Sequence, residues 1–415
     1  MYIYTVIPGD TLADISERLG VPQFVLIYAN GLREPYALTP GQALLVLDDI
    51  TGYTVTPGDT VFTVANRFGQ TEHTIWRLNP SLAGGTVLYP GQTLFLPTSA
   101  PQNRLTATGY AYPFINRAVL RTTLPYLDYL GIFSYGFRSD GSLVVPDDGD
   151  LIGIASEYGT VPMLVLTSLG DDGRFSSEAV SNMLENEDVQ STLIENIANT
   201  AQSKGYGAVN SDLEYIPPED RELYNSFIAD LADELHSRGI ELTVSLAPKS
   251  KDDQEGLLYE AIDYESIGRS ADRVLLMTYE WGYTYSEPRA VAPINLVSEV
   301  VDYALTKIPS QKIDLGMPNY GYDWAIPWVQ GTAARAIGNI QAQELAIDRG
   351  SPILYNETAA TPYFNYTNED GGRRQVWFED ARSVMAKLEL ARYRNLGGIG
   401  VWQIMKWFPQ LWLQV

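Results

Sequence analysis

The sequence predicts an α/β protein in which two small βααβ units precede a (β/α)8 barrel that carries a small α+β insertion. Three observations support this: a duplicated pattern at the N-terminus, a polar segment after it, and then a long alternation of apolar strands and amphipathic helices. The predicted boundaries are 1–48 and 52–98 for the two units and 104–415 for the barrel, with the insertion at about 325–376.

The duplicated pattern recurs with its pieces in the same order. "YTVIPGDTLADISERLGV" at 4–21 returns as "YTVTPGDTVFTVANRFGQ" at 53–70, and "LTPGQALLVL" at 38–47 returns as "LYPGQTLFLP" at 88–97. Each copy begins with a short strand, turns at Pro-Gly-Asp-Thr, and continues through two short helices to a Pro-Gly turn and a closing strand. The predicted caps of the first helices are Asp10 with Thr11 and Asp59 with Thr60.

These units resemble the LysM carbohydrate-binding module. The resemblance implies that the two loops flanking the helices bind glycans containing N-acetylglucosamine, such as peptidoglycan or chitin. Alternatively, the side chains in these loops serve only as turn and cap residues, and backbone groups bind the glycan. The matching positions are Gly9, Asp10, Thr11, Asn30, Gly31 and Leu32 in the first unit, and Gly58, Asp59, Thr60, Asn79, Pro80 and Ser81 in the second.

The pattern of apolar and polar residues changes after the polar segment "TSAPQNR" at 98–104, which we expect to be a linker. Strand-like runs such as "VPMLVLTSL" then alternate with helix-like runs such as "PEDRELYNSFIADLADELHSRG", a pattern typical of a parallel sheet. Between "NYGYDW" and "VWFEDARSV" a hairpin-like stretch with Asp370, Gly371 and Gly372 near its tip predicts the insertion.

Composition excludes several functional classes. A formal charge of −23 argues against nucleic acid as a partner. The chain has no cysteine, and its two histidines, His73 and His236, lie in different domains, so we expect no disulfide, metal or cofactor. No stretch approaches the ~20 apolar residues of a membrane span. We expect a monomer without a secretory signal, which would reach a cell wall or another extracellular polymer by deposition from a mother cell or after lysis.

The segment "GAVNSDLEYI" places three polar residues at two-residue intervals. Side chains two apart on a strand share a face, so Asn210, Asp212 and Glu214 point together, away from Val209 and Leu213. In a barrel the apolar pair belongs on the helix side, which directs the polar three inward and toward the C-terminal mouth, where catalytic groups of this fold lie. The alternative is an edge strand with a solvated face, which requires an antiparallel neighbourhood that the flanking helices do not favour.

Two carboxylates on one strand favour a particular reaction. Their α-carbons would lie about 6.6 Å apart, so both side chains approach a bound sugar from the same side. A general acid and a displacing nucleophile instead flank the scissile bond. We therefore expect the 2-acetamido oxygen of N-acetylglucosamine to be the nucleophile. Asp212 would orient the acetamide N–H, stabilise the oxazolinium charge and raise the pKa of Glu214, the general acid.

The same strand resembles the strand-four motif of glycoside hydrolase family 18, Asp-Gly-x-Asp-x-Asp-x-Glu. The last two acids are kept as Asp212 and Glu214, whereas the preceding acid is Asn210 and the leading Asp-Gly is Gly207-Ala208. An Asn in this place is familiar from the branch that contains bacterial spore cortex-lytic N-acetylglucosaminidases. The resemblance implies that loss of the leading Asp removes a buried support of Asp212.

Three further segments resemble the same family: "MTYEWGY", "GMPNYGYDW" and "GGIGVWQI". The resemblance implies that Tyr279 binds the acetamido carbonyl, that Glu280 stands where the family often has Asp, that Tyr320 and Asp323 point toward the sugar, and that Trp402 forms the floor beneath it. Taken individually, Tyr279 and Trp402 are also compatible with a barrel core.

Together these features predict a peptidoglycan N-acetylglucosaminidase, directed by the resemblance toward spore cortex, that cleaves β-1,4 bonds after N-acetylglucosamine with retention. The two LysM units would raise the local concentration of the glycan. Glu214 would be the general acid/base, Asp212 the acetamide orienter, Tyr279 the carbonyl partner and Asn210 a support. Two alternatives stay open: a chitinase or chitin-oligosaccharide hydrolase with the same chemistry, and a catalytically silent, lectin-like spore or cell-wall protein.

Overall fold

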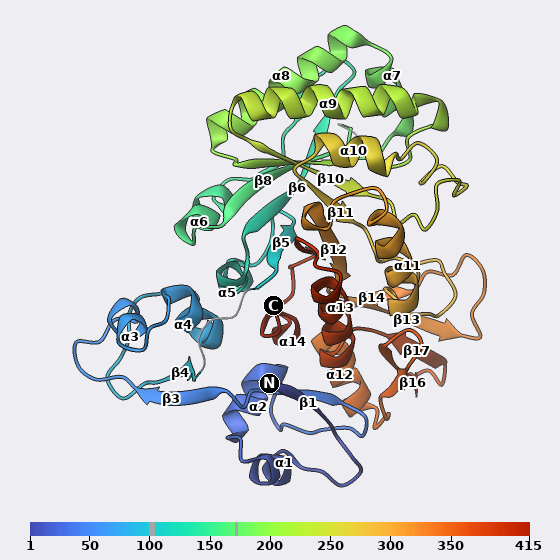
Figure 1. Cartoon of the computed structure of the whole chain (residues 1–415). Helices are drawn as coiled ribbons and strands as arrows, with labels where there is room; N and C mark the ends of the chain where they lie inside the picture. The colour runs from blue at the N-terminus through green and yellow to red at the C-terminus, as the bar shows by residue number, and fades with distance from the viewer. Residues whose placement is uncertain (99–103, 171–172) are drawn as a thin grey trace.

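The computed structural model describes residues 1–98, 104–170 and 173–415, so most of the predicted linker at 98–104 lies outside the described residues. Figure 1 shows a barrel, coloured cyan to red, above two small N-terminal units coloured in blues. Among the described residues, no helix is both long and apolar enough to cross a lipid bilayer.

Each N-terminal unit has the predicted order of strand, two helices and closing strand, and its two strands pair antiparallel. Thr11 and Thr60 cap the first helices, because each hydroxyl accepts a hydrogen bond from the backbone amide three residues later. The elements are β1 (Tyr2–Thr5), α1 (Leu12–Leu19), α2 (Gln23–Asn30) and β2 (Ala43–Val46), then β3 (Ile50–Thr54), α3 (Val61–Arg67), α4 (Glu72–Leu78), the 3₁₀ turn η1 (Pro80–Leu82) and β4 (Thr93–Pro97).

The predicted barrel is confirmed. Its strands run in the spatial order β5-β18-β12-β11-β10-β9-β8-β6, and β6 closes the cylinder on β5. All of these neighbours are parallel, and a short β7 (Leu143–Val144) adds antiparallel to β6. The strands are β5 (Thr106–Ala111), β6 (Tyr129–Phe137), β8 (Val161–Thr167), β9 (Ala208–Asp212), β10 (Glu241–Leu246), β11 (Arg273–Leu276), β12 (Ile313–Pro318) and β18 (Gly398–Trp402).

Helices follow most of these strands and cover the outside of the barrel (Figure 1). The predicted long helix after the carboxylate strand is α9, and its apolar side is buried against the barrel. The last helix, α14, has only one turn. The helices are α5 (Arg117–Thr123), α6 (Leu151–Glu157), α7 (Ser177–Leu184), α8 (Glu187–Lys204), α9 (Arg221–Ser237), α10 (Tyr264–Ser270), α11 (Ile294–Ala304), α13 (Ala381–Tyr393) and α14 (Pro409–Trp412), with the 3₁₀ turns η2 (Leu124–Tyr126), η3 (Pro218–Asp220) and η4 (Ser310–Lys312).

The insertion between β12 and α13 is an antiparallel sheet of order β14-β13-β17-β16-β15 together with helix α12. The predicted hairpin is present, since β16 pairs antiparallel with β17 across the turn that contains Gly371. The sheet begins at Gly321, earlier than the predicted boundary. Its elements are β13 (Gly321–Ile326), β14 (Arg335–Ile337), α12 (Asn339–Asp348), β15 (Leu354–Asn356), β16 (Thr361–Thr367) and β17 (Arg373–Trp377).

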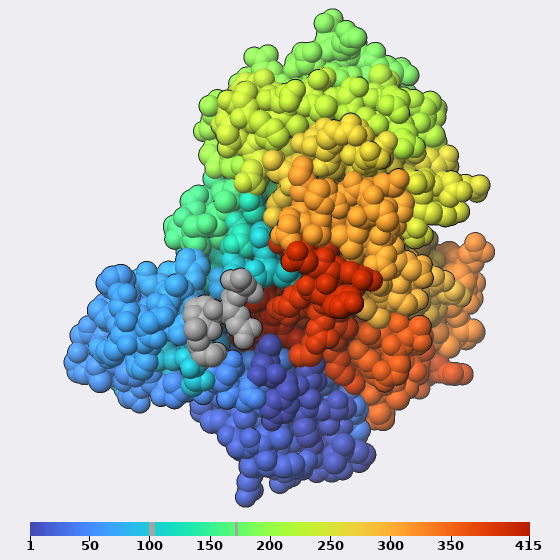
Figure 2. All heavy atoms as spheres, viewed as in Figure 1, coloured from blue at the N-terminus to red at the C-terminus, as the bar shows by residue number. Residues whose placement is uncertain are grey.

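Both N-terminal units pack directly on the barrel, and Figure 2 shows the first unit seated against the red C-terminal segment. In the second unit, the Arg77 guanidinium donates to the Pro125 carbonyl at 2.7 Å, and the Arg77 carbonyl accepts a hydrogen bond from Tyr28 of the first unit at 2.8 Å. The Tyr126 hydroxyl of the barrel donates to the same carbonyl. Both N-terminal units and the barrel therefore meet at Arg77, so the units contact the barrel directly and are not joined to it by the linker alone.

Candidate active site

A cavity of about 440 Å³ opens at the C-terminal ends of the barrel strands. The strand β9 brings Asp212 to its wall, and Glu214 follows two residues beyond the end of that strand. Residues from β6, β18 and the loops after β10 and β11 complete it. The lining residues are Phe133, Asp212, Glu214, Tyr215, Pro248, Leu258, Tyr259, Met277, Tyr279, Glu280, Trp281, Tyr283 and Trp402.

The side chains of β9 alternate as the sequence predicted. Val209 and Leu213 are buried in the core between the barrel and its helices. Asn210 lies on the opposite face, where its amide oxygen accepts a hydrogen bond from the Ser245 hydroxyl of β10 at 3.2 Å. Asp212 lies on that same face, and among the described residues its Oδ1 has no hydrogen-bond partner. A buried carboxylate oxygen without a protein donor is ready to accept a hydrogen bond from a ligand.

The two carboxyl groups have pKa values above their ordinary range. Burial raises the pKa of Glu214, and the negative charges of Asp212 and Glu280 raise it further. Burial also raises the pKa of Asp212, and the neighbouring Ser245 hydroxyl lowers it by a smaller amount. Glu214 thus remains protonated at a pH where an exposed glutamate would be ionised, as a general acid requires.

Glu280 is held by two tyrosines. Its carboxylate accepts hydrogen bonds from the Tyr320 hydroxyl and from the Tyr322 hydroxyl, the latter at 3.2 and 3.3 Å. Its backbone has φ of +66°, a strained conformation for a non-glycine residue. Strain of this kind persists where the surroundings fix a side chain, and here it directs the carboxylate into the cavity beside Tyr279.

Trp402 ends β18 and forms one wall of the cavity. Its ring meets that of Phe133 edge-on at a centroid distance of 4.8 Å and that of Tyr112 at 5.8 Å. These contacts fix the indole plane so that its remaining surface faces the cavity. An aromatic face fixed in this way is suited to packing against the apolar face of a sugar ring.

The structure places aromatic residues at the cavity that the sequence analysis did not single out. Trp281 directly follows Glu280, and Tyr283 lies two residues further, so the density of aromatic residues in "MTYEWGY" could have indicated them. Tyr215 directly follows Glu214, is 49% exposed and has φ of +56°. Phe133 and Tyr259 come from separate strands and loops, and no local pattern marks them.

Asp323 does not point toward a sugar, and that expectation was wrong. Its side chain is 1% exposed and is surrounded by insertion residues. One oxygen accepts from Arg335 at 2.9 Å and from Tyr366 at 2.8 Å, and the other accepts from Arg374 at 2.8 Å. The reason is that the chain leaves the barrel after β12, so Asp323 belongs to β13 of the antiparallel sheet. Tyr320, between these strands, lines a neighbouring cavity and donates its hydroxyl to Glu280.

The replaced Asp-Gly pair lies away from the cavity. A Cβ built on Gly207 would lie 2.7 Å from a methyl group of Val161, at the N-terminal end of the neighbouring strand β8. Ala208 is buried inside the barrel. Neither position is among the residues that line the cavity, and Ser245 is a polar group that lies beside Asp212.

In the N-terminal units most predicted glycan-binding side chains are engaged in internal hydrogen bonds. The carboxylate of Asp10 accepts from Tyr4 and Arg18, and that of Asp59 accepts from Tyr53 and Arg67. They do not cap the helices, contrary to the prediction, because each is held against its own strand and helix. Gly9 and Gly58 turn the chain with φ of +92° and +93°.

The two asparagines that end the second helices are buried, at 1% exposure for Asn30 and 4% for Asn79. Each side chain bridges its helix to the closing strand: Asn30 donates to the Leu26 and Leu45 carbonyls, and Asn79 to those of Ile75 and Phe95. Both are therefore structural, and neither side chain is open to a glycan. The alternative in which backbone groups of these loops bind the glycan fits this arrangement.

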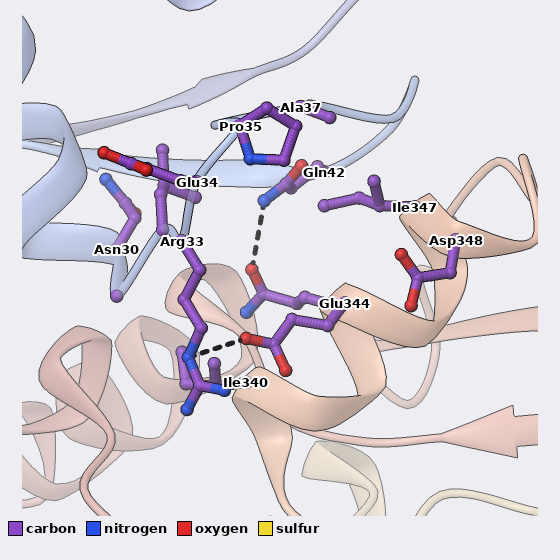
Figure 3. Close-up of a pocket in the computed structure, with 13 residues that line it drawn as sticks. Asn30, Arg33, Glu34, Pro35, Ala37, Gln42, Ile340, Glu344, Ile347 and Asp348 are labelled. Carbon is purple, nitrogen blue, oxygen red and sulfur yellow. Dashed lines mark hydrogen bonds and ion pairs between the residues drawn. The ribbon is translucent and has the colours of Figure 1, made fainter.

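The loop after Asn30 faces helix α12 of the insertion across a pocket of about 300 Å³ (Figure 3). Arg33 pairs with Glu344 at 3.0 Å, and Gln42 donates to Gln343 at 3.2 Å, so that two contacts cross this pocket. One side of the predicted binding loop of the first unit therefore faces the insertion of the catalytic domain.

The family model of glycosyl hydrolases family 18 matches residues 135–406, and the LysM domain model matches residues 4–46 and 53–97. The chain belongs to glycosyl hydrolases family 18. It is thus a glycosidase with two LysM domains, and the resemblance seen in the sequence is confirmed.

Relatives within family 18 cover nearly the whole chain. A cortical fragment-lytic enzyme of Bacillus subtilis is 38% identical over 420 residues, which span 100% of this chain and 97% of that protein. The crystal structure of the Bacillus megaterium spore cortex-lytic enzyme SleL is similar, with a TM-score of 0.84, 36% identity and coverage of 99% of this chain and 96% of that one. A chitinase structure from Chromobacterium violaceum is similar over 75% of this chain and 98% of that one, with a TM-score of 0.70 and 25% identity.

Proposed function

We propose that this family 18 glycosidase is an N-acetylglucosaminidase that cleaves β-1,4 bonds after N-acetylglucosamine in peptidoglycan by a retaining, substrate-assisted mechanism. The observation that carries the proposal is that Asp212, at the end of β9, and Glu214, two residues beyond it, line one cavity, both with raised pKa. A second protein carboxylate on the opposite side of the bond, needed for direct displacement, is not supplied by this pair.

In the first step Glu214 donates its proton to the glycosidic oxygen as the bond from that oxygen to C1 breaks. The acetamido carbonyl oxygen of the same sugar attacks C1 and forms an oxazolinium ion. Oδ1 of Asp212, which has no hydrogen-bond donor in the described part of the chain, accepts the acetamide N–H and balances the positive charge. The Tyr279 hydroxyl donates to the acetamido oxygen, which holds it near C1.

In the second step the Glu214 carboxylate removes a proton from water, which attacks C1 and reopens the acetamide. Two inversions at C1 give net retention, and Glu214 returns to its protonated form. Asn210 supports Asp212 indirectly, because Ser245 donates to Asn210 and lies beside Asp212. Glu280, fixed by its tyrosines, contributes negative charge and a further acceptor for sugar hydroxyls.

Spore cortex peptidoglycan is the substrate we propose. Two proteins that match this chain over nearly its full length are called a cortical fragment-lytic and a spore cortex-lytic enzyme. The LysM domains would bind the same glycan and raise its concentration near the barrel. The similarity to a chitinase over three quarters of the chain supports chitin oligosaccharides as the second candidate.

The test compares wild type with Glu214→Gln on cortex fragments, vegetative peptidoglycan and chitin oligomers. The matched control is Glu219→Gln, which changes an exposed glutamate in the following 3₁₀ turn. We expect wild type and the control to release reducing ends from cortex fragments with the β-anomer formed first, and Glu214→Gln to be slower by ~10²–10⁴-fold. Inactivity of wild type on all three substrates would show a glycan-binding protein instead. Cleavage of chitin oligomers alone would change the proposed substrate from peptidoglycan to chitin.

A further inference from the structure

A second cavity of about 170 Å³ adjoins the catalytic one. The two share Glu280 and Trp402 as lining residues, so a group that enters the second cavity lies beside the sugar bound over Trp402. The mechanism above does not use this space. Besides the shared pair it is lined by Asn319, Tyr320, Tyr322, Ala336, Ile337, Gln403 and Lys406.

The cation in this cavity, Lys406, is held in place from several directions. The side-chain amide of Asn319 donates to the Gln403 carbonyl at 3.0 Å and to the Lys406 carbonyl at 2.9 Å, which fixes the loop that follows Trp402. The aliphatic stem of Lys406 lies against Gly338, where an added Cβ would approach Lys406 Cδ to 2.7 Å. The ammonium group donates to Oε1 of Gln341 at 2.8 Å.

This lysine has no carboxylate partner within the part of the chain that the structure describes: its bonded partner is the neutral amide of Gln341. Partial desolvation lowers the pKa of Lys406, whose side chain remains exposed, and the acidic residue that lines the same cavity, Glu280, is bonded to Tyr320 and Tyr322. Lys204 and Lys387 differ in this respect, because they pair with Asp148 and Glu379, each at 2.8 Å. Lys249 and Lys312 donate to backbone carbonyls, and neither is among the residues that line the catalytic cavity. In a chain with 51 acidic and 28 basic residues, a cation left unpaired beside the sugar cavity is available to an anionic group of the ligand.

The space around Lys406 continues beyond this cavity. Asn319 and Lys406 also line a groove of about 540 Å³, together with Trp407, Ile340 and, from the first LysM domain, Leu32. A glycan bound in the catalytic cavity thus has room for a neighbouring residue or a substituent around the ammonium group. Chitin has no anionic substituent, because its residues are uncharged. Peptidoglycan has one, because its muramic acid residues bear carboxyl groups directly or through their peptides.

We propose that Lys406 is a specificity-determining residue that binds a carboxylate carried by the glycan beside the N-acetylglucosamine over Trp402. The inference rests on the proposed function and narrows its substrate to glycans bearing carboxylates. The carboxylate belongs either to the lactyl group of a muramic acid residue or to a peptide attached to it. Gln341 holds the ammonium group until the carboxylate binds, so that Lys406 is positioned in advance.

The test measures kcat/KM on soluble peptidoglycan oligosaccharides in matched pairs, one with free carboxylates and one with the same carboxylates converted to methylamides. One pair has no peptides, so the lactyl group carries the charge, and the other keeps its peptides. We expect wild type to prefer the charged member of at least one pair about tenfold, mainly through a lower KM. The pair that shows the preference identifies the source of the carboxylate.

Lys406→Met is expected to bring the charged-to-neutral ratio close to one, and Lys406→Arg to keep a preference for the charged member. The matched control is Arg269→Met, which removes a positive charge from an exposed i,i+4 pair on α10 and should keep the wild-type ratio. Because the readout is a ratio within one protein, a general loss of folding does not imitate it. An unchanged ratio in Lys406→Met, or no preference in wild type on either pair, overturns the inference. Wild-type inactivity on every oligosaccharide would instead contradict the proposed function.

Discussion

Asp212 in the barrel and Asp59 in the second LysM domain have opposite surroundings. Hydrogen bonds from the Tyr53 hydroxyl and the Thr56 amide lower the pKa of Asp59, with Arg67 paired to its other oxygen at 2.8 Å. Burial raises the pKa of Asp212, whose Oδ1 has no donor among the described residues. The barrel thus leaves a carboxylate unsatisfied, which is unfavourable for the folded protein and useful to a ligand, whereas the LysM domain satisfies its own.

The two LysM domains also differ from one another although their sequences repeat. In the first domain the Pro40-Gly41 turn is covered by the insertion: the Ile353 amide donates to the Pro40 carbonyl at 2.9 Å, and Thr39 donates to the Ser351 carbonyl at 3.0 Å. In the second domain no atom of the described residues lies within 4 Å of a Cβ built on Gly91.

Their asparagines differ in the same way. Asn30 accepts a 2.7 Å hydrogen bond from Gln410 of the barrel, and Gln410 in turn accepts from Gln343, so buried amides connect the first domain to α14 and α12. Asn79 bonds only within its own domain among the described residues. The first domain therefore serves as part of the barrel's outer layer, where α14 has only one turn, and the second keeps its turn open to solvent.

The largest expected effect is a loss of activity in Asp212→Asn that Asp59→Asn does not share. Asp212→Asn should lower kcat on cortex fragments by ~10²–10³-fold, because the charge that stabilises the oxazolinium ion is lost. The same change removes an unsatisfied buried carboxylate, so the thermal midpoint should not fall. Asp59→Asn should do the reverse, with a lower midpoint and near-normal activity on soluble fragments. Activity assays and thermal unfolding of both variants check this, and equal activity losses would contradict it.

Alanine substitution at the Pro-Gly turn should destabilise the protein more in the first LysM domain than in the second. Gly41 and Gly91 have φ of +82° and +89°, so alanine costs ~1–2 kcal/mol at either position. At Gly41 the new Cβ would also lie 1.9 Å from the Ile353 carbonyl oxygen, which adds ~1–3 kcal/mol. We expect Gly41→Ala to unfold at a lower urea concentration than Gly91→Ala. Identical midpoints would show that the first domain is not locked to the insertion.

The open turn of the second domain should contribute to glycan binding. Tyr89 is 70% exposed beside Gly91, whereas the corresponding Thr39 is 3% exposed. Tyr89→Ala should weaken retention on insoluble peptidoglycan by about 2–10-fold through loss of an aromatic surface. Phe62→Ala, which removes a 61% exposed ring from α3, serves as the control. A sedimentation assay checks the pair, and equal retention of both variants would place the binding surface elsewhere.

The smallest effect concerns pH. Glu214 acts as an acid, so activity is present below its pKa and is lost as pH rises through it. The charge of Asp212 raises this pKa more than that of Glu280 does, and burial raises it most. Glu280→Gln should therefore move the alkaline limb of kcat/KM modestly toward lower pH, and Asp212→Asn, in its residual activity, should move it further. A limb that stays in place in both variants would show that another group sets it.

Much of the fold could be predicted because its signals are local. Turn and cap chemistry at Thr11 and Thr60, and the two-residue period at Val209 and Leu213, each act within a few residues. Asp323 could not be predicted, because its environment depends on where the chain leaves one sheet for another. The residues that hold its carboxylate are 12, 43 and 51 positions away.

The sequence by itself determined the repeated LysM domains, the barrel and the paired inward direction of Asp212 and Glu214, because period, capping and spacing are properties of neighbouring residues. Only the tertiary structure decided which of the two equivalent turns stays open, since the covering segment around Ile353 is more than 300 residues away. It also decided that Lys406, beside the catalytic cavity, bonds to the neutral amide of Gln341 and to no carboxylate of the described residues. Burial and charge pairing depend on what the whole chain brings together.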